Sequence, residues 1–142
     1  MIKYYIYISL FSLVYSQHFD IEILNTGESS LFIFETTITS LTSGDEVGLF
    51  DQNGLVDSDG NTGEILVGTG IWNGSQLDVV GIQGVDLSQF GGPILPGAIS
   101  GNDLVLKVWI ASEQVEYVTT YDISLGTGTF NSLFTAISEV YL

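Results

Sequence analysis

Apolar and polar residues alternate with a period of two along most of the chain, a pattern typical of β-strands. Residues 104–110 are the clearest case, because every second residue there is leucine, valine or isoleucine. Segments of this kind are separated by turn sequences rich in glycine, asparagine and aspartate, such as Asn73-Gly74. We therefore expect eight strands, at residues 18–24, 30–38, 46–50, 63–72, 76–82, 103–111, 113–123 and 132–142.

Strands at this spacing, with apolar residues on both faces, favour an all-β fold. We expect an antiparallel β-sandwich, immunoglobulin-like or jelly-roll in type, with about eight strands. A closed β-barrel is the alternative. Residues 85–90 fit one short helical turn, and residues 89–97, with two prolines and three glycines, fit a rigid loop. Residues 17–142 should form a single domain.

The first 16 residues resemble a secretory signal peptide. Lys3 supplies a positive start, residues 4–15 are uncharged and mostly apolar, and Ser16 is a small residue at the expected cleavage point. The run is too short for a membrane span. We expect cleavage before Gln17, an extracellular or cell-surface location and no membrane insertion of the mature chain. The alternative is a buried first strand.

The chain is strongly acidic, with 17 acidic residues against two lysines and no arginine, and a formal charge of −15. This composition excludes the clusters of basic residues that bind nucleic acid or anionic membranes. The chain has no cysteine, which excludes thiol chemistry and cysteine-ligated zinc. His18, the one histidine, follows the expected cleavage site closely, where chains are usually mobile. We expect no catalytic residues and no enzymatic activity.

The densest acidic stretch, residues 44–64, is the candidate ion site. Five of its acids and amides repeat at the two-residue spacing that can turn alternate oxygen ligands toward a hard cation such as Ca²⁺, and Glu64 could complete the shell. The EF-hand pattern does not fit, because Thr62 stands where that loop needs glycine. The alternative is a solvated turn, since these residue types also build turns. The candidate ligands are Asp51, Asn53, Asp57, Asp59, Asn61 and Glu64.

Two tryptophans are candidates for contact with a ligand. Trp72 falls in an expected strand, and Trp109 lies on the polar side of its strand beside Lys107. An exposed aromatic ring on a sandwich face can stack on a sugar. The alternative is that these rings pack under a loop or at an interface.

Two stretches, "TGESSLFIFETTITSLTSGDEVGLFD" and "GEILVGTGIWNGSQLDVVGI…DLSQFGGPILPG", resemble a β-sandwich module of exported bacterial surface proteins associated with type nine secretion. The resemblance covers most of residues 19–140 and centres on "GDEVGLFD" at residues 44–51. It implies a β-sandwich in a secreted or surface protein, and it carries no catalytic residue to this chain.

Three functions follow as hypotheses. The first is a non-catalytic adhesion or interaction module, stabilised by calcium, that binds a protein or glycan at the cell surface. The second is a carbohydrate-binding module. The third is a structural subunit of an extracellular filament or layer, which self-assembles by pairing of edge strands.

Overall fold

The computed structural model describes residues 16–131 and 133–142. The expected signal peptide therefore lies, apart from Ser16, outside the described residues. The described chain is built of strands with one short 3₁₀ turn, η1 (Ser88–Phe90). The strands are β1 (Ser29–Phe34), β2 (Glu46–Leu55), β3 (Thr62–Ile71), β4 (Leu77–Ile82), β5 (Val85–Asp86), β6 (Ile94–Leu95), β7 (Leu104–Ile110), β8 (Val115–Val118), β9 (Thr120–Leu125) and β10 (Phe134–Tyr141).

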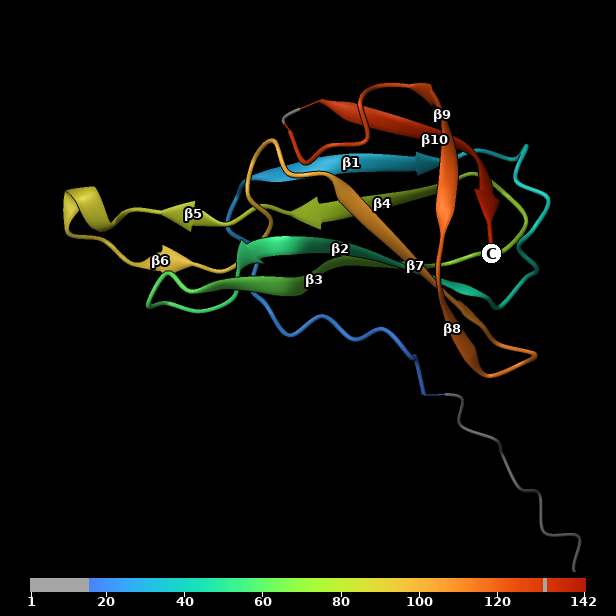
Figure 1. Ribbon diagram of the computed structural model, residues 1–142, viewed down its shortest axis with the longest axis horizontal. Coiled ribbons are helices and arrows are strands. Elements are labelled where there is room, and N and C mark those ends of the chain that lie inside the picture. The colour runs from blue at the N-terminus through green and yellow to red at the C-terminus, as the bar shows by residue number, and fades with distance from the viewer. Residues whose placement is uncertain (1–15, 132) are drawn as a thin grey trace, which may run out of the picture.

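Eight of these strands form two four-stranded sheets that face each other (Figure 1). Sheet A has the order β4-β1-β10-β9, and sheet B has the order β3-β2-β7-β8. The sheets do not close into a barrel, so the sandwich prediction is confirmed over its alternative. One pair departs from the expected antiparallel pattern, because β1 and β10 run parallel, with Leu31 beside Phe134.

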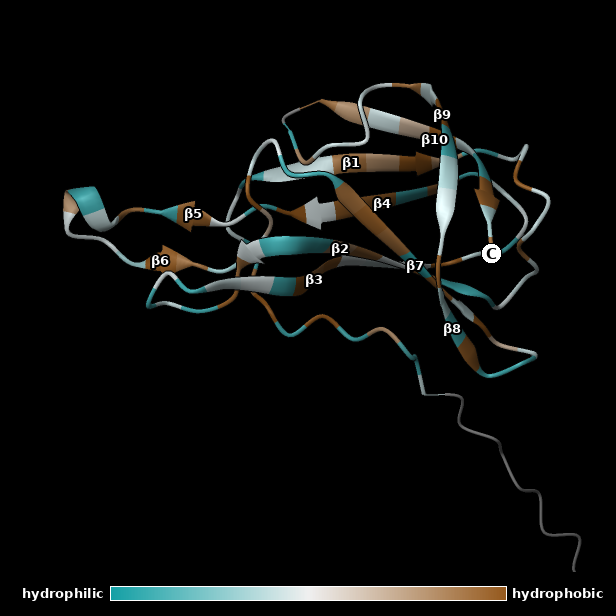
Figure 2. Ribbon diagram, in the orientation of Figure 1, coloured by the Kyte–Doolittle hydropathy of each residue, from teal (hydrophilic) through white to brown (hydrophobic). Residues whose placement is uncertain are grey.

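The alternation seen in the sequence places one face of each strand in the core. In β7, Leu104, Leu106, Val108 and Ile110 are all buried, and the residues between them are half-buried on the outer face. Phe32 of β1 meets the ring of Phe130 edge-on, with centroids 5.5 Å apart. Each such side chain contributes about 1.5–3 kcal/mol to stability. Apolar colour accordingly runs along much of β1, β4 and β7 (Figure 2).

The two sheets approach each other closely at both sides. On one side, a Cβ added to Gly68 of β3 would lie 2.5 Å from the carbonyl oxygen of Val80 in β4. This contact explains the first glycine of "VGTG", since a side chain there would clash with backbone, while a Cβ at Gly70 would lie 2.9 Å from the side chain of Val79. On the other side, the chain passes from β8 to β9 through Thr119, whose backbone N–H and hydroxyl both donate to the Leu106 carbonyl at 3.0 Å.

Three expected segments differ from the structure. Residues 18–24 form no strand, and residues 113–123 divide at Thr119 into strands of different sheets. The expected loop after residue 50 is mostly strand, because β2 continues to Leu55 and β3 begins at Thr62. Patterning alone missed these boundaries because it shows which side chains share a face and does not show which strand, if any, a segment pairs with.

An arm formed by β5 and β6 projects from one end of the sandwich (Figure 1). The expected helical turn is present at its tip as η1, and the predicted rigid loop contains β6. Phe90 at the tip is 86% exposed. Among the described residues, no helix is long and apolar enough to cross a membrane.

Candidate functional site

Asp51, the first predicted calcium ligand, is a buried structural residue. Its carboxylate accepts hydrogen bonds from the backbone N–H groups of Asn53 and Ile99, at 2.9 and 2.8 Å, and from Asn102 Nδ2 at 3.0 Å. Only 1% of the residue is exposed. Because its oxygens are occupied by these donors, Asp51 ties the end of β2 to the turn before β7.

Asp57 organises the turn between β2 and β3. It accepts hydrogen bonds from the backbone N–H groups of Asp59 and Asn61, and its second oxygen accepts one from Asn61 Nδ2 at 2.8 Å. These bonds, led by the one from the Asn61 side chain, lower the pKa of Asp57. The same carboxylate that looked like an ion ligand therefore closes a tight turn.

The remaining predicted ligands do not gather around one point. Glu64 faces the outer side of sheet B, where it accepts a hydrogen bond from Lys107 Nζ at 2.7 Å. Asn53 and Asp59 are exposed. Within the residues that the structure describes, no group of three or more acidic, histidine or cysteine side chains could hold a metal ion. Calcium binding remains a prediction without a gathered set of ligands.

The two candidate tryptophans have different surroundings. Trp72 is 2% exposed and belongs to the core, so its ring has no open face for a ligand. Trp109 lies on the outer face of sheet B, opposite Glu46 and Glu116. The His18 ring stacks on it at 3.8 Å with an interplanar angle of 7°. That contact takes up one face of the ring that a sugar would use.

The N-terminal segment, residues 16–24, holds that stack in place. The Glu46 carboxylate accepts hydrogen bonds from the backbone N–H of His18 at 2.9 Å and of Phe19 at 3.0 Å. His18 Nε2 lies 2.8 Å from a carboxylate oxygen of Glu116. Backbone donors, a ring stack and an acid thus fix a segment that the sequence suggested would be mobile.

Phe19 completes the cover over sheet B. Its ring is 3% exposed and meets Phe50 edge-on at 5.7 Å, while Lys107 Nζ lies 4.3 Å from the centre of the Phe50 ring. The sequence did contain a signal for this contact. Phe50 and Trp109 occupy outward positions on one face of sheet B, and two aromatic rings on one face favour burial under another segment.

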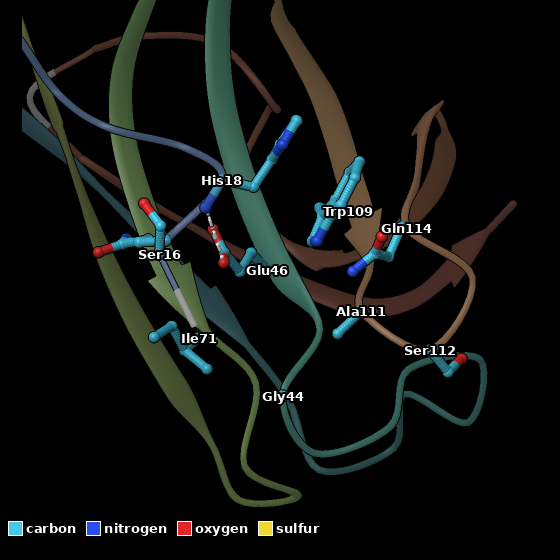
Figure 3. A pocket seen from close by; sticks show the side chains of 10 residues that line it. Ser16, His18, Gly44, Glu46, Ile71, Trp109, Ala111, Ser112 and Gln114 are labelled. Carbon is cyan, nitrogen blue, oxygen red and sulfur yellow. Dashed lines mark hydrogen bonds between the residues drawn. The ribbon is translucent and has the colours of Figure 1, made fainter. Parts of the chain in front are cut away.

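An open groove of about 850 Å³ remains between this segment and the end of sheet B (Figure 3). Ile71 and Ala111 form part of its wall, and Glu46 and Trp109 line it beside His18. Both Glu46 oxygens are engaged by backbone N–H groups, and the His18 ring is held between Trp109 and Glu116. The carboxylate and the imidazole of the groove therefore hold the chain in place.

The outer face of sheet A differs, because no described segment lies over it. Strand register places Leu31 between Val80 and Phe134, and Ile33 beside Ala136, whose other neighbour is Leu125. We call five large apolar side chains of this face the sheet A patch: Leu31, Ile33, Val80, Leu125 and Phe134. Val80, Leu125 and Phe134 are 53%, 57% and 43% exposed. Apolar groups from four adjacent strands therefore remain in contact with water.

The charge around the sheet A patch is entirely negative among the described residues. Asp78 lies opposite Ile33 on the same face, Glu28 and Glu35 flank β1, and Asp122 belongs to β9. The basic side chains of the described residues are His18 and Lys107, and both lie on sheet B. The patch is thus an apolar surface bordered by carboxylates.

Comparison with known proteins finds no matching family model, no matching curated protein and no matching solved structure.

Proposed function

We propose that this protein is a non-catalytic interaction module, acting outside the cell or at its surface, that binds a protein partner through the sheet A patch. The observation that carries this proposal is the difference between the two outer faces. The N-terminal segment covers the central strands of sheet B, and the exposed Ile71 and Val118 of that face lie in its edge strands, β3 and β8. The exposed apolar side chains of sheet A instead extend over all four of its strands and have no cover from the described chain. Contiguous exposed apolar surface is characteristic of interaction sites.

The extracellular assignment rests on the sequence, namely the signal-like residues 1–16 and the resemblance to modules of exported proteins. A non-catalytic role is supported by the groove, whose carboxylate and histidine serve structural contacts. A carbohydrate-binding role has less support, because Trp72 is buried and Trp109 already stacks on His18.

Site-specific photocrosslinking tests the proposal. A photoreactive phenylalanine analogue is placed at Phe134, in the sheet A patch, or at Phe90 on the arm, which is more exposed and serves as the control. In cells that naturally make the protein, we expect one discrete heteromeric product from position 134 and none from position 90. Equal labelling from both positions, or no product from position 134, would refute the proposal.

A further inference from the structure

The charge distribution around the sheet A patch indicates which kind of partner fits it. We infer that the patch binds a cationic protein segment, one whose apolar side chains are interspersed with lysine or arginine. This inference rests on the proposed function and adds the chemistry of the partner. Its basis is the juxtaposition of an uncovered apolar face with carboxylates on its surface and borders.

The apolar part of the contact comes from register. Val80, Leu31 and Phe134 lie side by side across three strands, so a partner can contact them along one line perpendicular to the strands. Covering these side chains removes apolar surface from water, which favours binding. These contacts would supply the affinity, and the flanking charges would select the partner.

The electrostatic part comes from the acids. Asp78 is exposed on the same face as Ile33. Glu28 precedes β1, Glu35 follows it, and Asp122 belongs to β9. No basic side chain of the described chain lies on this sheet to neutralise them. A partner that carries lysine or arginine beside its apolar residues therefore gains attraction where a neutral or acidic one does not.

A second copy of the chain fits this face poorly. Each copy carries a formal charge of −15, and two sheet A faces would bring like charges together. Anionic membranes are disfavoured for the same reason. Sheet B already shows how an extended segment can be held on an outer face of this fold. The Glu46 carboxylate accepts hydrogen bonds from the backbone of the segment, and the buried ring of Phe19 packs beneath it.

Titration calorimetry with designed peptides tests the inference. The full chain is titrated with a short peptide of alternating leucine and lysine, and with its leucine–glutamate counterpart. We expect micromolar binding of the first and none of the second, and weaker binding as salt is raised. Phe134→Ser and Val80→Ser should each reduce affinity about tenfold, because each removes one buried contact.

The matched control is Phe90→Ser, which removes an exposed aromatic ring from the arm and should leave affinity unchanged. Asp78→Asn should weaken binding about two- to threefold, as expected for a partly screened charge. Equal binding of the acidic peptide, or equal loss in the arm variant, would overturn the inference. So would self-association in sedimentation velocity that the patch variants abolish, or binding to zwitterionic lipid vesicles in place of the peptide.

The two experiments fail in distinguishable ways. If position 134 crosslinks a partner in cells but the basic peptide does not bind, the inference about charge is wrong and the proposed function stands. If position 134 gives no crosslinked product and the basic peptide does not bind, both the proposed function and the inference about charge are wrong.

Discussion

At the scale of single residues, the acidic side chains that suggested an ion site instead hold the backbone together. Glu46 accepts hydrogen bonds from the backbone N–H groups of His18 and Phe19, Asp51 accepts from the Ile99 N–H and the Asn102 amide, and Asp57 closes a turn of its own. These roles depend on contacts between residues far apart in the sequence. Spacing along the chain could identify the acids, but it could not predict which donors they meet.

Removal of the Asp51 carboxylate should be costly. Asp51→Ala leaves the Ile99 N–H and the Asn102 amide without their acceptor in a buried position, so we expect a loss of about 2–3 kcal/mol in the free energy of unfolding. Asp59→Ala, at an exposed position, should cost less than about 0.5 kcal/mol. Urea denaturation measures both, and equal losses would contradict the structural role of Asp51.

Asp57 should make stability depend on acid pH. Its pKa is lowered below the ordinary value of 3.8 by hydrogen bonds that form only in the folded state. The resulting stabilisation is complete above that value and is lost as the pH falls through the lowered pKa. Asp57→Asn should therefore flatten the fall in melting temperature below about pH 4. An unchanged slope in thermal melts of this variant would show that the turn does not contribute.

The effect of Ca²⁺ on stability tests the same acidic residues as ion ligands. Because the carboxylates of Asp51 and Asp57 already accept hydrogen bonds from the chain itself, we expect the melting temperature to be the same in Ca²⁺ and in a chelator. A rise in melting temperature that grows with Ca²⁺ concentration, and that Asp57→Asn removes, would restore the ion site.

At the scale of elements, the N-terminal segment is the main departure from the pattern of the sequence. Residues 18–24 alternate like a strand, yet they lie across the outer face of sheet B without joining a sheet. Periodicity shows which side chains of a segment share a face. It does not show whether the segment pairs with the edge of a sheet or packs across the sheet's outer face. Most other strands were predictable, because their alternation matches one buried face and one outer face.

The anchoring of this segment can be tested at Phe19. Phe19→Ala removes a ring that is 3% exposed against Phe50, so we expect a loss of about 3 kcal/mol in stability and a change in Trp109 fluorescence as the His18 stack loosens. Leu24→Ala, at a residue that is 85% exposed in the same segment, is the control and should change neither. If the two variants behave alike, the segment is not held by this contact.

At the scale of the whole molecule, the outer faces of the two sheets differ in charge and in solvent exposure. Sheet B carries the basic side chains of the described residues and is covered over its central strands, while sheet A is bordered by acids and is open across all four strands. The sandwich was predictable from strand count and turn chemistry. The parallel pairing of β1 with β10, which brings Phe134 beside Leu31, was not, because it joins the two ends of the domain.

Methyl NMR of the protein with its crosslinked partner tests the binding face most directly. The account predicts that the methyl signals of Leu31, Ile33, Val80 and Leu125 shift on addition of the partner. Those of Ile71 and Val118, which lie on sheet B and are exposed, should stay in place. Shifts confined to sheet B or to the arm, with the sheet A patch unchanged, would contradict the account.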